Sequence, residues 1–76
     1  MKDIKIIILK EEDGYVAFPI GLKGVVVSDG DTYEEAYNNI KEAIKFHIET
    51  FGDAILDEIE TPLEAYIADL KVSSPR

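Results

Sequence analysis

A single amphipathic helical pattern fills the middle of the chain, from Thr32 to Gly52. Apolar side chains recur there every three or four residues, which is the period of a helix that buries one face. Thr32 is expected to be the N-cap residue, with Glu35 completing a capping box, and Gly52 is expected just after the last turn. The apolar positions are Tyr33, Ala36, Tyr37, Ile40, Ala43, Ile44, Ile48 and Phe51. Because one helix covers only one face of a sheet, a sheet in this chain is expected to have an uncovered face.

Three runs of strand-forming residues precede the helix. Residues 4–9 are β-branched and apolar on both faces, which is typical of a strand in the centre of its sheet. Residues 11–14 predict a hairpin turn, because their Asp-Gly pair offers the positive φ that tight turns require. Residues 14–19 predict a second strand, with Pro19 at its end or at a bulge because proline lacks a backbone donor. Residues 24–28 predict a third strand.

The part of the chain after the helix has a weaker pattern. Residues 53–64 fit either a short amphipathic helix that ends before Pro62 or an extended connection. Residues 65–72 alternate in polarity and predict a fourth strand, and residues 73–76 predict a disordered tail. We therefore expect one domain over residues 1–76.

These elements predict an α+β fold with the element order β-β-β-α-β. We expect the sheet order 3-2-1-4, with the fourth strand parallel to the first and the main helix on one face. The uncovered face then carries apolar side chains of the first strand, either the Ile4, Ile6 and Ile8 set or the Ile7 and Leu9 set. Monomers rarely expose an apolar patch of that size, so we expect a homo-oligomer, a dimer or larger.

The charge balance limits the classes of partner. The chain has 76 residues, with 16 acidic against 8 basic side chains and a formal net charge of −8. Such a surface repels nucleic acid and anionic membranes, so we expect neither as a direct partner. No apolar run approaches the roughly 20 residues that a membrane helix needs, and the first residues do not resemble a signal peptide. We expect a cytoplasmic protein.

No pattern of catalytic or metal-binding residues stands out. His47 is the only histidine, and no motif places a nucleophile or an orienting acid beside it. A zinc or iron site needs several nitrogen or sulfur ligands, and the chain has no cysteine. Asp29 and Asp31 flank Gly30 without the spacing of a calcium loop. We therefore expect no enzyme activity, no cofactor and no metal.

Several short motifs occur in a fixed order along the first two thirds of the chain. A tyrosine-containing strand over residues 14–19 ends in Phe-Pro, a Leu-Lys-Gly turn follows at residues 22–24, and Gly-Asp-Thr-x-x-Glu-Ala opens the helix at residues 30–36. This series resembles the HicB antitoxin family over about residues 3–52. The residues that carry it are Gly14, Pro19, Gly24, Gly30, Asp31, Thr32, Glu35 and Ala36. We expect Gly30 to adopt an unusual backbone angle and Ala36 to permit close packing of the helix on the sheet.

The resemblance implies a partial ribonuclease-H-like fold without the catalytic carboxylates of that enzyme. It also implies a function, which is to neutralise HicA, a small basic toxin that cleaves mRNA and uses a histidine. The sequence departs from the family at Lys23, where proline is preferred, and at Val25, where cysteine is common. Many HicB proteins carry a C-terminal DNA-binding module, whereas here only residues 73–76 follow the last predicted strand. We expect a stand-alone domain that does not bind an operator directly.

The charge and the resemblance together predict a surface for a basic protein partner. An acidic protein attracts a basic RNA-binding toxin and can mask its RNA surface. We expect the partner to contact Tyr15, Phe18, Leu22 and Val26, although Tyr15 also suits cross-strand packing. Two alternatives stay open, namely a homo-oligomeric binding or regulatory module without a toxin partner and a hydrolase that uses His47.

Overall fold

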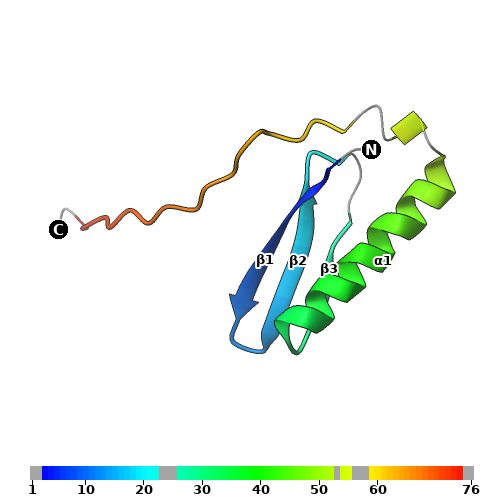
Figure 1. The fold of residues 1–76 in the computed structure, drawn as a ribbon. Coiled ribbons are helices and arrows are strands. Elements are labelled where there is room, and N and C mark those ends of the chain that lie inside the picture. The colour runs from blue at the N-terminus through cyan, green and yellow to red at the C-terminus, as the bar shows by residue number, and fades with distance from the viewer. Residues whose placement is uncertain (1–2, 23–25, 53, 56–58, 75–76) are drawn as a thin grey trace.

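The computed structural model describes residues 3–22, 26–52, 54–55 and 59–74, and it has a three-stranded antiparallel sheet with one long helix (Figure 1). The strands are β1 (Lys5–Glu11), β2 (Gly14–Ile20) and β3 (Ser28–Gly30), and the helix is α1 (Tyr33–Phe51). The sheet order is β1-β2-β3. The α+β class and the predicted order of the first three strands are therefore confirmed.

The hairpin of β1 and β2 forms as the sequence predicts. Glu11 lies opposite Gly14, so only two residues form the turn between the strands. Gly14 has a φ of 143°, a backbone conformation that residues with a Cβ rarely adopt. The expectation that the first strand is central is wrong, because β2 pairs with both neighbours and β1 has a partner on one side only among the described residues. Apolar residues on both faces of β1 therefore do not mark a central position.

The third strand begins later than predicted. Residues 24–28 were expected to form it, but β3 starts at Ser28 and pairs with β2 only at Tyr15–Ala17. Gly24 and the first predicted residues of this strand lie outside the described residues. Pro19 lies near the end of β2, beyond the part that pairs with β3, so its missing N–H leaves no gap in that ladder.

Helix α1 has the predicted bounds and caps. The Glu35 N–H donates to the Thr32 hydroxyl at 3.1 Å, as an N-cap requires. The Glu35 carboxylate accepts from the backbone N–H of Asp31 at 3.1 Å, one residue before the usual position in a capping box. At the other end, Gly52 is the C-cap residue, and its N–H donates to the Ile48 carbonyl at 2.8 Å.

Gly30 is required for close packing rather than for an unusual backbone angle. The described glycines with positive φ do not include Gly30, so that expectation is wrong. A Cβ added to Gly30 would lie 2.5 Å from the Ala36 nitrogen and 2.9 Å from the Glu35 carbonyl carbon. Ala36 itself is fully buried. The strand end and the first turn of α1 are therefore too close for any side chain at position 30.

The core lies between α1 and one face of the sheet. Ile4, Ile6 and Ile8 pack against it, so β1 presents this set to the helix. The side chains of a strand alternate between faces, so a second apolar set lies on the side away from α1. We call this side the open face, and its residues are Ile7, Leu9, Val16, Phe18 and Ile20. The buried core residues are Ala17, Leu22, Val26, Ala36, Ile40, Ile44 and Ile59.

The described residues after α1 contact the sheet but add no strand to it. Ile59 is buried in the core, the Glu60 N–H donates to the Gly21 carbonyl at 3.1 Å, and the Thr61 hydroxyl donates to the Asp3 carbonyl at 3.0 Å. Of the region predicted as either helix or connection, residues 54–55 form a short helical turn and residues 59–64 have no helix. Residues 53 and 56–58 lie outside the described residues.

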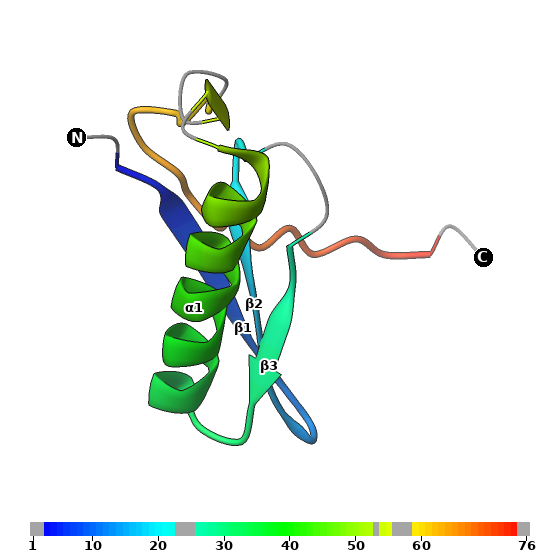
Figure 2. The ribbon, with the colours of Figure 1, turned by 90° about the vertical axis from the view of Figure 1, so that its right-hand side faces the viewer.

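The predicted fourth strand at residues 65–72 does not form. These residues are exposed and without regular structure, and they extend away from the sheet (Figures 1 and 2). Residues 73–74 are exposed as well, and residues 75–76 lie outside the described residues. An alternating pattern shows only that a segment has an apolar face, and it does not identify the sheet edge that the segment pairs with. The predicted order 3-2-1-4 is therefore wrong in its last member.

None of the helices in the described part of the chain is long and apolar enough to cross a membrane.

Replacing Gly30 with alanine should lower the free energy of unfolding by about 1–3 kcal/mol, because overpacking forces neighbouring atoms apart. Urea unfolding followed by circular dichroism measures the change. Asp29→Ala is the matched control, since this neighbouring side chain is exposed, and we expect it to stay within about 0.5 kcal/mol of the parent. A Gly30→Ala protein as stable as the parent would contradict the close contact.

Candidate partner-binding surface

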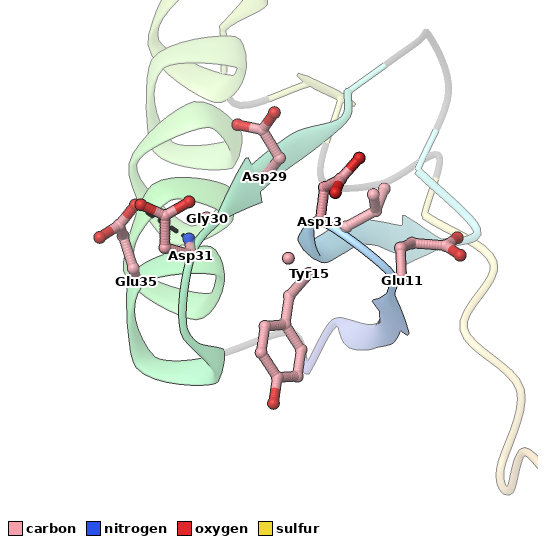
Figure 3. Close-up of a pocket in the computed structure, with 9 residues that line it drawn as sticks. Glu11, Asp13, Tyr15, Asp29, Gly30, Asp31 and Glu35 are labelled. Atoms are coloured by element: carbon pink, nitrogen blue, oxygen red, sulfur yellow. Dashed lines mark hydrogen bonds between the residues drawn. The ribbon is translucent and has the colours of Figure 1, made fainter.

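A groove lined by carboxylates lies at the hairpin-turn end of the sheet (Figure 3). Its volume is about 230 Å³. Side chains from the β1–β2 hairpin, from β3 and from the first turn of α1 line it. We call it the acidic groove, and its residues are Glu11, Asp13, Gly14, Tyr15, Val16, Asp29, Gly30, Asp31 and Glu35.

Two glycines bring the walls of this groove together. A Cβ at Gly14 would lie only 2.7 Å from the carbonyl oxygen of Gly30, so the start of β2 and the end of β3 touch through their backbones. Tyr15 lies opposite Gly30 in the ladder. Figure 3 shows Asp29 and Asp31 on the β3 side of the groove and Asp13 on the hairpin side. The close backbone contact thus gathers carboxylates that are far apart in the sequence.

The side chain of Asn39 holds α1 against the same strand. Its amide nitrogen donates to the carbonyl oxygen of Asp29 at 2.8 Å. This bond and the capping bonds of Glu35 and Thr32 fix the helix start beside the groove. The N-terminal end of a helix carries a partial positive charge, which offsets part of the repulsion between the nearby carboxylates.

The acidic groove carries negative charges on a concave surface. No group of three His, Cys, Asp or Glu side chains suited to holding a metal occurs among the residues that the structure describes. A concave surface with charges of one sign concentrates its electric field and attracts the opposite charge over a distance. The Lys10 ammonium lies 4.8 Å from the centre of the Tyr15 ring, so one positive charge already borders the groove. The arrangement can bind lysine and arginine side chains of a partner.

A second, apolar groove lies along the C-terminal half of α1. Its volume is about 250 Å³, and the exposed fractions of Val27, Phe46 and Phe51 are 58%, 70% and 64%. The ring of His47 lies 4.7 Å from the ring of Phe51, with the two planes tilted by 48°. Sequence reasoning missed Phe46, although an aromatic residue outside the apolar stripe of a helix is a visible sign of an exposed contact surface. The lining residues are Val26, Val27, Ala43, Phe46, His47, Thr50 and Phe51.

The four residues predicted to contact a partner do not lie together. Leu22 and Val26 are buried in the core, each with an exposed fraction of 8%. Tyr15 packs against the core and lines the acidic groove. Phe18 lies on the open face, opposite Ile7. Contact with a partner stays a prediction for all four residues. Leu22 and Val26 also belong to the core, and Val26 lines the apolar groove.

The chain is similar to a curated protein of nearly the same length. It is 50% identical over 56 residues to a UPF0150 protein of Helicobacter pylori strain J99, and the match covers 74% of this chain and 72% of that protein. No protein-family model matches the chain. No solved structure matches it either.

Two neighbouring valines test whether Val26 is buried in the core while Val27 is exposed on the surface. Val26→Ala should lower the free energy of unfolding by roughly 1–3 kcal/mol, because it removes two buried methyl groups and leaves a cavity. Val27→Ala makes the same chemical change at a side chain that is 58% exposed, and we expect a loss below about 0.5 kcal/mol. Thermal and urea unfolding of the two variants provide the measurement. Equal losses would refute the assignment.

Proposed function

The chain belongs to the UPF0150 family, and we propose that it acts as a HicB-like antitoxin that binds and masks a basic HicA-type toxin. In this proposal the protein is cytoplasmic and has no catalytic step of its own. It needs no cofactor, because masking requires only a complementary surface. The proposal includes the partial ribonuclease-H-like fold of the HicB family.

One observation carries the proposal, namely that several of the motif residues line the acidic groove. The motifs that resemble the HicB pattern supply Gly14, Tyr15, Gly30, Asp31 and Glu35, and each of these lines the groove. Gly14, Gly30 and Glu35 also serve the fold, in the hairpin turn, in the close contact with α1 and at the helix start. Here the same short motifs build a charged concave surface, which supports a role in binding.

The chemistry of the proposed complex follows from charge. A toxin that binds RNA presents lysine and arginine side chains to the phosphate backbone. The groove offers carboxylates to the same side chains, and a net charge of −8 adds a long-range attraction. The protein would then compete with RNA for the toxin surface and prevent mRNA cleavage by occlusion.

A rival function rests on a different observation. Large apolar side chains are exposed on this small protein, among them Phe46, Phe51 and Tyr66. Such surfaces favour a homo-oligomeric binding or regulatory module of the same fold without a toxin partner. The two functions differ in whether a basic partner binds.

The direct test uses the product of a small basic reading frame adjacent to the gene. We expect the two proteins to co-purify when expressed together, and we expect this protein to protect RNA from that product in a cleavage assay. The mechanism predicts no RNA cleavage by this protein alone. The absence of a complex with any adjacent basic product would overturn the antitoxin proposal and favour the rival function.

Charge removal in the groove should weaken the complex. Asp13→Asn combined with Asp29→Asn removes two exposed carboxylates from the acidic groove, and we expect the Kd for the toxin to rise about tenfold or more, a size typical of close charge pairs. Calorimetry at low and high salt measures the change, and the difference from the parent should shrink as salt screens the charges.

The matched control makes the same change in net charge elsewhere. Glu42→Gln combined with Glu49→Gln removes two exposed carboxylates of α1 that do not line the groove. Binding by this control should stay within about twofold of the parent, since long-range attraction alone is weak at physiological salt. If both variants lose the same affinity, overall charge and not the groove determines binding.

A further inference from the structure

The part of the chain from Pro62 to Ser74 is exposed, carries several large apolar side chains, and pairs with none of the described strands. We call it the C-terminal segment. The exposed fractions of Leu63, Tyr66, Ile67, Leu70 and Val72 lie between 79% and 95%. The Tyr66 hydroxyl donates to the Glu64 carboxylate, a contact within the segment itself. Exposing large apolar side chains to water is unfavourable, so we expect the segment to be buried against another protein surface.

The dimensions of the molecule reflect the same feature. The radius of gyration is 15.1 Å, and the principal extents are 52 × 27 × 19 Å. A compact chain of this length has a radius of gyration of about 11 Å. Figures 1 and 2 both show the segment leading away from the sheet and the helix. The last segment therefore lies outside the body that the sheet and α1 form.

The sheet has a matching free edge. Among the described strands, β1 pairs with β2 alone, so its other edge carries unpaired backbone donors and acceptors. Helix α1 lies mainly over β3 and β2, so the side chains of Ile6 and Ile8 on β1 are only half-buried. A strand beside β1 would satisfy the backbone groups and cover these two side chains.

The C-terminal segment has the length and pattern of that missing strand. Residues 65–72 span about 26 Å when extended, and the seven residues of β1 span about 23 Å. Tyr66, Ala68, Leu70 and Val72 lie on one side of the extended segment, which is apolar throughout. Asp69 and Lys71 lie on the other side, where Ile67 is the one large apolar residue. Such an alternation suits an edge strand with one face on the core and one face in water.

We propose that the C-terminal segment of one copy pairs with the β1 edge of a second copy, and that the exchange is reciprocal. A twofold symmetric dimer covers both segments and both free edges with one interaction repeated twice. The path of the chain favours pairing with the β1 of a second copy over pairing with the β1 of the same molecule. The contacts of Glu60 and Thr61 hold the chain at the end of the sheet, and after the bend at Leu63 it extends away from its own β1.

This dimer is independent of the proposed antitoxin function. The segment leaves the sheet beside Asp3 and Gly21, where β1 begins and β2 ends. The acidic groove lies at the opposite end, where Glu11 faces Gly14 across the hairpin turn. Of the residues that line the groove, only Glu11 belongs to β1, so a strand on the free edge of β1 leaves most of the groove open.

The test uses the full chain and begins with its mass in solution. Each copy has a mass of 8.5 kDa, and we expect sedimentation equilibrium to show a dimer that dissociates on dilution. Tyr66→Ser combined with Leu70→Ser should raise the dimer Kd by about a hundredfold or more, because two large apolar side chains lose their cover. Asp69→Ser, on the other side of the segment, should change the Kd by less than about threefold.

Backbone pairing has its own measurement. Amide hydrogens of residues 65–72 should exchange slowly in the dimer and fast after dilution. Consecutive backbone N–H groups of a strand point to opposite edges, so either Ile67 or Ala68 directs its N–H at β1. One of the two variants Ile67→Pro and Ala68→Pro should therefore remove a hydrogen bond to β1 and weaken the dimer. Ser74→Pro, outside the paired residues, should leave the dimer unchanged.

The outcomes separate the possible occupants of the β1 edge. A monomer with protected amides at residues 65–72 means that the segment folds back on its own β1, and this overturns the proposal. A monomer with unprotected amides overturns it too. A dimer that survives Tyr66→Ser/Leu70→Ser uses another surface, such as the open face. A dimer that this variant disrupts but whose segment amides exchange freely lacks strand pairing, and it also overturns the proposal.

Discussion

The contact between the end of β3 and the first turn of α1 determines how the rest of the molecule is arranged. Gly30 and Ala36 meet there with no room for a larger residue, and Asn39 adds a hydrogen bond to the carbonyl of Asp29. This contact fixes the direction of the helix over the sheet. It also places the helix start beside the hairpin turn, so the carboxylates of three separate elements line one groove. Folding and the candidate binding surface therefore depend on the same few atoms.

A chain of this size has little apolar surface to bury, and the placement of that surface decides which parts of the molecule are free to bind partners. A domain of about 60–80 residues buries only about 60% of the surface that its unfolded chain exposes. Here seven of the described residues form the buried core, and several large apolar side chains of the C-terminal segment stay in water. The acidic groove and this segment lie at opposite ends of the sheet. Binding a basic partner and associating with a second copy are compatible, because only Glu11 of the groove lies on β1.

The success of prediction depended on how local each feature is. The helix from Tyr33 to Phe51, its cap at Thr32 and the two-residue hairpin turn depend on neighbouring residues, and they were predicted correctly. Gly30 was chosen correctly as a special position but for the wrong reason, because a close approach between two elements is not visible in the order of residues. Leu22 and Val26 were expected on a partner surface, yet they are buried, since burial depends on what packs opposite.

The sequence by itself determined the α+β class, the strand-forming character of β1 and β2, the position of the helix and the strong negative charge. Each of these follows from residue type and spacing along the chain. Only the tertiary structure decided that β2 is central, that α1 covers the Ile4, Ile6 and Ile8 set, and that the carboxylates gather in one groove. It also left residues 65–72 without a strand partner. The reason is that an alternating or helical pattern defines an apolar face, whereas the surface that covers this face is supplied by residues far away in the chain.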